Sequence, residues 1–123
     1  MRIYSKWQDI RFNTFLTNQE FRCKCKNESC TATILDGALS IAFLEFRALC
    51  GVPVIINSGY RCPQHNAAIS GATRSRHMMG QAVDISRKTL GHLSDRDIKE
   101  RARIAGFKFV KFYSAWIHLD VRG

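Results

Sequence analysis

Two histidines and one aspartate of this 123-residue chain have the types and the spacing of metal ligands. His77 lies seven residues before Asp84, and His118 follows near the far end of the chain. Two imidazoles and one carboxylate form the ligand set of a catalytic zinc ion, whose fourth position stays open to water or substrate. By pattern alone, however, such residues on a strand also serve as surface or hydrogen-bonded groups.

The segments around these residues must bring them together. Residues 82–85 predict a strand whose apolar members point away from the face that carries Asp84, and His77 precedes this strand in a turn. Near the C-terminus, His118 and Asp120 alternate with apolar residues and so share one face of a strand, about 7 Å apart along it. This inward-facing pair needs a metal, a hydrogen-bond network or solvent as its partner, because an uncompensated buried carboxylate is costly.

The remaining pattern predicts a single α+β domain over residues 1–123, with a small antiparallel-leaning sheet and helices packed on one side. Apolar residues at three- and four-residue steps predict the main core helix over 33–49, which Gly51 and Pro53 end. Residues 1–20 are expected to form an N-terminal arm, with Tyr4, Trp7, Phe12 and Phe15 as aromatic anchors. The other predicted elements are strands at 54–56 and 82–85, two strands within 107–121, and helices at 63–70 and 94–105.

The charge balance limits the classes of partner. Nineteen lysines and arginines against ten aspartates and glutamates give a net charge of +9, which attracts polyanions. The basic residues are spread along the chain without an RNA-binding signature, so no nucleic-acid partner is expected. Anionic cell-wall polymers and acidic membrane surfaces fit the charge equally well. No apolar run is long enough to span a membrane, so no integral membrane contact is expected. We also expect the protein to be a monomer.

Five cysteines raise the question of redox state. They are Cys23, Cys25, Cys30, Cys50 and Cys62. The first three lie close together in the string RCKCKNESC, whose spacing differs from the paired CxxC of a zinc ribbon. Reduced thiols of a cytoplasmic product, a disulfide arrangement and three ligands of a structural metal are all compatible with this pattern.

Three strings of the sequence resemble a known family. They are SGYRCPQHN at 58–66, SRHMMGQAVDI at 75–85 and WIHLDVRG at 116–123. These strings are similar to the zinc D-Ala-D-Ala carboxypeptidases and peptidoglycan endopeptidases that share the hedgehog-type fold, in the short single-domain branch of bacteria and phages. The resemblance covers most of residues 15–123. It implies one Zn²⁺ ion per chain, held by His77, Asp84 and His118.

The same resemblance implies roles for other polar residues. The arginine of the SGYR motif is Arg61, whose planar guanidinium suits a substrate carboxylate or developing negative charge. Ser75 is implied as a hydrogen-bonding, substrate-binding residue, and His65 as a residue that lines the cleft. Many relatives carry an acidic general base three residues before the distal histidine, where this chain has Ala115. Asp120 is therefore the candidate base or water-orienting residue; alternatively, it pairs with an arginine or supports a histidine.

These expectations combine into a function. The sequence predicts a zinc metallopeptidase that hydrolyses peptidoglycan stem peptides with metal-activated water, as a D-Ala-D-Ala carboxypeptidase or an endolysin-type endopeptidase. The alternative is a noncatalytic cell-wall-binding or structural module of the same fold, because the acid is missing at Ala115. The start, MRIYSKWQDIRF, lacks the apolar core of a signal peptide. We therefore expect synthesis in the cytoplasm and delivery to the cell wall by a partner or a phage particle.

Overall fold

The computed structural model describes residues 1–122, so only Gly123, the last residue of the string WIHLDVRG, lies outside the described residues. Over the described residues the chain forms four α-helices, one 3₁₀-helix and six strands. In chain order these are β1 (Arg2–Ser5), α1 (Asn18–Phe21), β2 (Ala32–Leu35), α2 (Gly37–Cys50), β3 (Ile56–Ser58), α3 (Pro63–Ala68), η1 (Arg76–Met79), β4 (Ala82–Ser86), α4 (Asp95–Ala105), β5 (Phe109–Phe112) and β6 (Trp116–Asp120).

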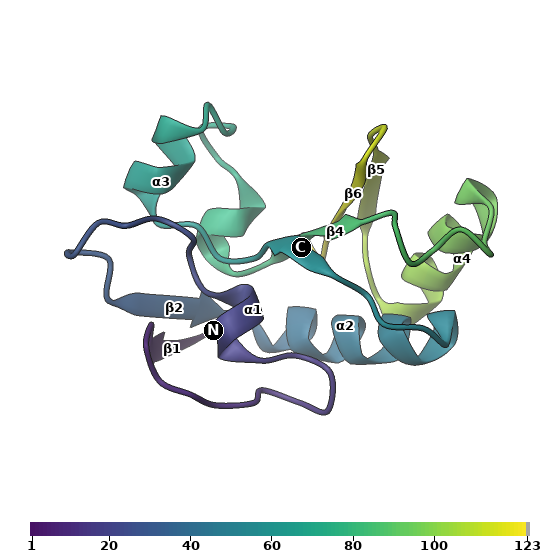
Figure 1. The fold of residues 1–123 in the computed structure, drawn as a ribbon, viewed down its shortest axis with the longest axis horizontal. Coiled ribbons are helices and arrows are strands. Elements are labelled where there is room, and N and C mark those ends of the chain that lie inside the picture. The colour runs from purple at the N-terminus through teal and green to yellow at the C-terminus, as the bar shows by residue number, and fades with distance from the viewer. Residues whose placement is uncertain (123) are drawn as a thin grey trace.

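Two antiparallel sheets organise the chain. The larger sheet has the strand order β3-β4-β6-β5, and β1 pairs with β2 in a separate two-stranded sheet. Figure 1 shows α2 running along one side of the larger sheet with α4 next to it, while α3 lies at the opposite side of the molecule from α2. This arrangement confirms the predicted α+β class with an antiparallel sheet.

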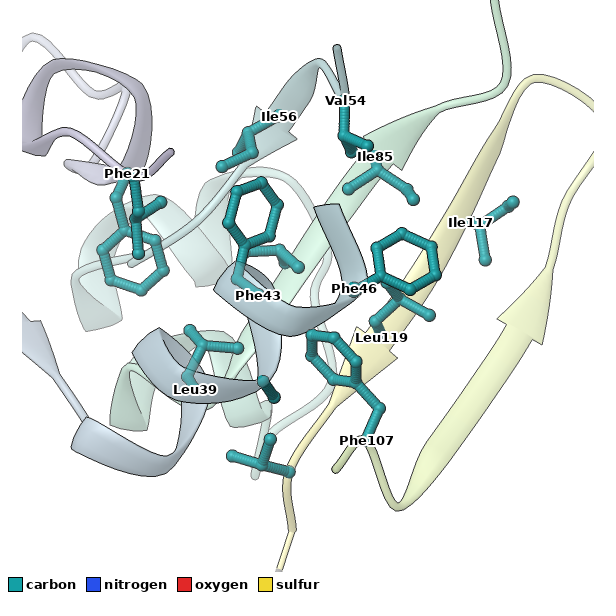
Figure 2. Close-up of a cluster of buried hydrophobic side chains, with 14 of the residues drawn as sticks. Phe21, Leu39, Phe43, Phe46, Val54, Ile56, Ile85, Phe107, Ile117 and Leu119 are labelled. Carbon is teal, nitrogen blue, oxygen red and sulfur yellow. The ribbon is translucent and has the colours of Figure 1, made fainter. Parts of the chain in front are cut away.

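The hydrophobic core lies between α2 and the larger sheet. Phe43 and Phe46 of α2 are fully buried and point toward Ile85 and Leu119, which come from the central strands β4 and β6 (Figure 2). Burial of each such side chain contributes roughly 1.5–3 kcal/mol of stability. Because side chains alternate along a strand, packing this face on α2 turns the polar residues of β4 and β6 to the opposite face.

The main core helix is confirmed, but it begins later than the sequence predicts. Residues 33–35 belong to β2, and α2 starts after Asp36, whose side chain accepts a hydrogen bond from the Ala38 N–H at 2.9 Å. The prediction was wrong there because apolar residues of a strand extended the helical spacing by one turn. The end is as predicted, since Gly51 adopts the left-handed conformation with φ of 71°.

The N-terminal arm contains more structure than predicted. β1 pairs with β2 in antiparallel register, so the arm forms half of a two-stranded sheet. Tyr4, Phe12 and Phe15 pack against the core as expected of anchors. Trp7 does not, because 64% of its surface is exposed.

The other predicted elements are present with small shifts. The helices at 63–70 and 94–105 appear as α3 and α4, and Ser94 caps α4 as its side chain accepts from the Asp97 N–H. The C-terminal pair of strands appears as β5 and β6. The strand predicted at 54–56 is found two residues later, at Ile56–Ser58. No helix among residues 1–122 is long and apolar enough to cross a membrane.

Candidate metal centre

The register of the larger sheet places two predicted ligands side by side. Asp84 on β4 is the cross-strand partner of His118 on β6, and Ser58 on β3 is the partner of Asp84 on its other side. Directly paired residues of antiparallel strands project their side chains to the same face, about 5 Å apart at Cβ. The three side chains therefore form a polar row across the face that α2 leaves uncovered.

The third ligand, His77, is held over this row by η1. Ser75 caps η1, with its hydroxyl accepting from the His77 N–H at 3.3 Å. Gly80 ends η1 in the left-handed conformation, at φ of 67°. Any Cβ at Gly80 would lie 2.1 Å from the carbonyl oxygen of Ile34, so only glycine allows η1 to pack this closely on β2.

The tautomer of His77 follows from its hydrogen bond. Its Nδ1 lies 2.7 Å from the carbonyl oxygen of Gly59, which can only accept, so Nδ1 carries the proton and donates. In the neutral imidazole, Nε2 then presents a lone pair. Nε2 lies 3.2 Å from Asp84 Oδ1 yet makes no hydrogen bond, although the side chain is only 2% exposed. A buried lone pair that faces a carboxylate oxygen requires a cation or a proton between them.

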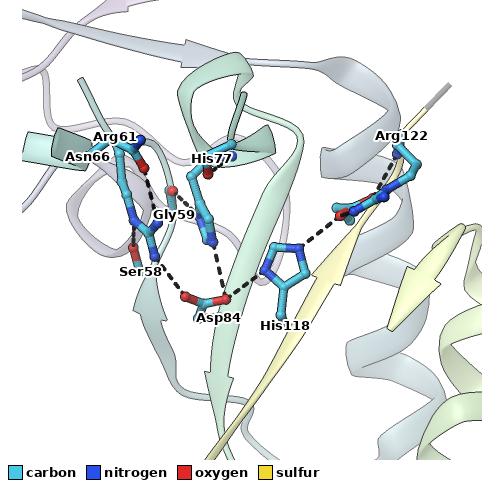
Figure 3. Close-up of polar contacts among 10 residues, drawn as sticks. Ser58, Gly59, Arg61, Asn66, His77, Asp84, His118 and Arg122 are labelled. Atoms are coloured by element: carbon cyan, nitrogen blue, oxygen red, sulfur yellow. Dashed lines mark hydrogen bonds and ion pairs between the residues drawn. The ribbon is translucent and has the colours of Figure 1, made fainter. Parts of the chain in front are cut away.

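His118 has the same arrangement with the roles of its two ring nitrogens exchanged (Figure 3). Its Nε2 lies 2.8 Å from Asp120 Oδ2, and its Nδ1 lies 2.9 Å from Asp84 Oδ1. When Nε2 donates to Asp120, the lone pair of Nδ1 points at Asp84. Each imidazole is thus oriented by a group on its far side, as is usual for metal-binding histidines.

The donor set fits a zinc ion. One ligand atom from each of His77, Asp84 and His118 lies within 4.8 Å of the other two. A tetrahedral zinc site with bonds of about 2.1 Å separates neighbouring nitrogen and oxygen ligands by about 3.4 Å, close to the 3.2 and 2.9 Å found between Asp84 and the two histidines. The sequence prediction of these three residues as one group therefore agrees with their placement.

The ionisation of the group also suits a cation. Burial opposes the charged form of Asp84, but the neighbouring His118 and His77 imidazoles outweigh it and hold its pKa below the ordinary value. Burial likewise works against protonated His118, but Asp120 and Asp84 raise its pKa above the ordinary value. A metal ion must displace that proton, so metal binding at this site weakens as the pH falls.

Asp120 supports His118 from behind. The carboxylate is fully buried, and both of its oxygens accept from the Arg122 guanidinium, Oδ1 from Nε at 2.8 Å and Oδ2 from Nη2 at 2.7 Å. Burial raises the pKa of Asp120, but the hydrogen bonds from Arg122 and His118 dominate and hold it below the ordinary value. Of the roles predicted for Asp120, this contact set favours orientation of the histidine.

Arg61 lies on the other side of Asp84. Its Nη2 donates to Asp84 Oδ2 at 2.9 Å and its Nε to the Ser58 hydroxyl at 3.1 Å, while Nη1 is 3.4 Å from Asn66 Oδ1. The side chain is 12% exposed, so the guanidinium is largely enclosed but reaches the site. Asp84 therefore offers one oxygen to the histidines and the other to Arg61.

A model of the peptidase M15 family matches residues 14–120, which is most of the chain and includes His77, Asp84 and His118. The chain belongs to the peptidase M15 family. Members of this family are metallopeptidases, and the group of His77, Asp84 and His118 supplies candidate metal ligands for this member. No curated protein matches the chain.

The candidate metal centre of this M15 family member opens into a pocket of about 520 Å³. The walls come mainly from the loop after α3, from η1 and from the β5–β6 hairpin, and Arg61 and Asp84 of β4 complete the lining. The lining residues are Arg61, Ile69, Ser70, Gly71, Ala72, Ser75, His77, Asp84, Phe109, Lys111, Tyr113, Trp116 and His118. Tyr113 and Trp116 stack at 4.4 Å between ring centroids and form an aromatic edge.

Some pocket residues were not predicted. Lys111 is the cross-strand partner of His118 and projects to the same face, which its register alone reveals. Trp116 stands two residues before His118 on the same strand, so the alternation along β6 is the signal that would have found it. Asn66 is buried and donates to the Ala72 carbonyl at 2.9 Å, which fixes the loop that borders the pocket.

Of the remaining predicted site residues, one lines the pocket and one does not. Ser75 lines the pocket, but its hydroxyl is engaged in capping η1. His65 on α3 is absent from the lining given by residues 1–122, so its placement adds no support for a role in substrate binding. Ala115 lies in the exposed turn between β5 and β6, beside the aromatic edge of the pocket.

Proposed function

We propose that this M15 family member is a zinc metallopeptidase that hydrolyses peptide bonds of peptidoglycan stem peptides. One observation carries the proposal: the lone pairs of His77 and His118 and one oxygen of Asp84 converge at the base of an open pocket. A zinc ion at this position supplies Lewis-acid activation of water and of a substrate carbonyl. The three residues hold the ion, and the pocket leaves room for the substrate.

Two cations in the pocket suit an anionic peptide. Arg61 and Lys111 both line it, and the guanidinium of Arg61 can bind a carboxylate through two parallel hydrogen bonds. Stem peptides carry free carboxylates at their ends and side chains. The stacked pair of Tyr113 and Trp116 offers an apolar surface for the aliphatic parts of the peptide. The protein then acts at the cell wall, with its positive charge assisting contact with anionic wall polymers.

This chain lacks the acidic general base that the resemblance leads one to expect at position 115. Among residues 1–122, Asp84 is the one carboxylate that lines the pocket, and it already serves the histidines and Arg61. We assign Asp120 to the orientation of His118, because its oxygens are buried behind the imidazole and occupied by Arg122. With no free carboxylate from residues 1–122 lining the pocket, the proton of an attacking water would pass to solvent.

The experiment that tests the function is digestion of purified sacculi by the zinc-loaded protein. Released peptides and their new ends are identified by mass spectrometry, which also distinguishes D-Ala-D-Ala cleavage from cleavage within the stem. Asp84→Asn keeps the side-chain shape but weakens a ligand and should abolish release. Asp97→Asn, on the exposed first turn of α4, is the matched control and should leave release unchanged.

One outcome would favour the alternative reading. If the zinc-loaded protein binds sacculi but releases no peptide of any kind, the chain is a noncatalytic wall-binding module of the same fold. The turn at Ala115, which lacks the acid expected from the resemblance, is the feature that favours this alternative.

A further inference from the structure

A second cluster of potential ligands lies away from the pocket. Cys23, Cys25 and Cys30 come from the connection between α1 and β2, and Cys62 is the residue that caps α3. One sulfur from each of the four lies within 4.8 Å of the other three. None of these cysteines lines the pocket beside the metal centre. The fold therefore brings together four thiols that are separated by as many as 39 positions in the sequence.

The spacing of the sulfurs suits a shared ion. Cys62 Sγ lies 3.7 Å from Cys23 Sγ and 3.8 Å from Cys25 Sγ. A tetrahedral zinc ion with four Zn–S bonds of about 2.3 Å separates its sulfurs by about 3.8 Å. A disulfide requires about 2.05 Å between sulfurs, and all five cysteines of the chain are free thiols. The four sulfurs thus have the mutual distances of a tetrathiolate metal site.

A buried lysine gives an independent indication that the cluster is negatively charged. Lys6 is only 1% exposed, and no Asp or Glu among residues 1–122 lies within ion-pair distance of its ammonium. Its Nζ instead lies 3.2 Å from the carbonyl oxygen and 3.5 Å from the sulfur of Cys25. A buried charge needs a counter-charge. Zinc with four thiolates carries a net charge of −2, which Lys6 partly neutralises.

Backbone amides also point at the sulfurs. The Cys62 N–H donates to Cys23 Sγ at 3.3 Å, and the His65 N–H donates to Cys62 Sγ at 3.4 Å. Hydrogen bonds of this kind orient thiolate ligands and stabilise their charge. They leave the remaining lone pairs of each sulfur free for the centre of the cluster.

We propose that Cys23, Cys25, Cys30 and Cys62 form a structural zinc site, separate from the metal centre in the pocket. The chain then carries two zinc ions, one more than the sequence analysis predicts. Soft thiolate ligands in tetrahedral geometry select zinc over the oxygen-seeking cations. The ion ties the connection after α1 to the start of α3.

The cysteine cluster lies next in sequence to residues of the pocket. Cys62 directly follows Arg61, and the preceding Tyr60 N–H donates to the Phe21 carbonyl at 2.7 Å. Gly59, whose carbonyl orients His77, packs so closely on Phe21 that a Cβ would lie 2.5 Å from its carbonyl oxygen. The cysteine site therefore fixes the segment that positions Arg61 and one carbonyl partner of the metal centre.

Metal content per chain tests the proposal without reference to activity. Elemental analysis of the full chain should give two zinc ions for wild type and for Cys50→Ala, the matched control at the cysteine outside the cluster. It should give one for Cys25→Ser. His118→Ala should also give one zinc ion, because the pocket site loses its ion while the cysteine site keeps its own. After cobalt substitution, the thiolate-to-cobalt charge-transfer absorption should survive in His118→Ala and disappear in Cys25→Ser.

A measurement on the unaltered protein guards against a variant that fails to fold. In the native wild-type protein, the bound metal should protect the four cysteines of the cluster from alkylation. They should be modified only after a chelator removes the metal. One zinc per wild-type chain, unchanged zinc in folded Cys25→Ser, iron in place of zinc, or a disulfide in the intact mass would each overturn the proposal. None of these outcomes depends on whether sacculi are cleaved, so the structural site and the proposed function can fail independently.

Discussion

The two clusters of potential metal ligands differ in donor atoms and in access. The pocket cluster of His77, Asp84 and His118 combines nitrogen and oxygen donors at the base of a pocket of about 520 Å³. The cysteine cluster offers four sulfurs, three of them on buried residues, and borders no part of that pocket. Catalytic zinc sites keep one position open, whereas structural sites are closed by four protein ligands. A domain of this size thus contains the donor sets of both kinds.

The surroundings of the clusters follow the same division. His118 is backed by the carboxylate of Asp120, which increases the basicity of a neutral ligand. The cysteine cluster is instead approached by the ammonium of Lys6 and by backbone N–H groups, which compensate negative charge. A ligand set that is already anionic needs donors around it, and a largely neutral set benefits from acceptors.

The largest expected effect is the loss of catalysis from the pocket cluster alone. His118→Ala removes one of three protein ligands, so the pocket site should lose its zinc and peptide release should fall to background. The fold should persist, because the cysteine site and the core between α2 and the sheet are untouched. Zinc analysis and sacculus digestion of the same sample check this. Release within tenfold of wild type would remove His118 from the ligand set.

The next effect is a loss of stability, which is expected when the cysteine cluster is altered and not when the pocket cluster is altered. Cys30→Ser should lower the free energy of unfolding by about 3 kcal/mol or more, because a structural zinc contributes directly to folding. For a chain of this length that corresponds to a fall in Tm of roughly 10 °C or more. Calorimetry of Cys30→Ser, Cys50→Ala and His118→Ala measures it. An equal or larger fall in Cys50→Ala would show that cysteine packing, and not a metal, accounts for the loss.

The pocket cluster was largely accessible from sequence, and the cysteine cluster was not. Asp84 and His118 sit in short strands whose alternation fixes the face on which they lie, and His77 is close in sequence to Asp84. Cys62 joins the other cysteines only because the segment before it crosses α1, where Tyr60 bonds to Phe21. Such a tertiary approach leaves no periodicity in the sequence, so three ligands were visible and the fourth was not.

The errors in the fold have a similar origin. Ile34 and Leu35 match the three- and four-residue spacing of α2 but pair with β1, a partner some thirty positions earlier in the chain. The cap at Asp36 was the local signal that could have separated strand from helix. The function of Asp120 was left open because sequence shows that it faces the metal side but not that Arg122 occupies both of its oxygens.

A smaller effect is expected at the boundary between the clusters. Arg61→Lys keeps the charge but loses the planar fork, so kcat/KM should fall about 10- to 100-fold, the value of one or two charged hydrogen bonds. The loss should be greater for peptides with a free terminal carboxylate than for their amides. Kinetics on both substrates check this, with zinc content as the control. Equal losses on both substrates would place Arg61 in support of Asp84 and not in contact with substrate.

The smallest effect on turnover is expected from Asp120→Asn. The variant keeps the size of the side chain but loses the charge that His118 and Arg122 share. If Asp120 orients His118, zinc affinity of the pocket site should weaken about 10- to 100-fold, while turnover at saturating zinc stays within tenfold of wild type. Zinc competition with a chelator gives the affinity, and digestion at several zinc concentrations gives the turnover.

The contrary result is equally specific. A general base typically contributes about 10²–10⁴ in rate, so a fall of that size with unchanged zinc affinity would make Asp120 the base. The geometry argues against it, because Asp120 accepts from His118 once and from the side chain and backbone N–H of Arg122 three times, which occupies all four of its lone pairs. For Asp120 to act on water, the pair with Arg122 would have to open. Arg122→Gln should then raise turnover, whereas an orienting role predicts a further loss of zinc affinity.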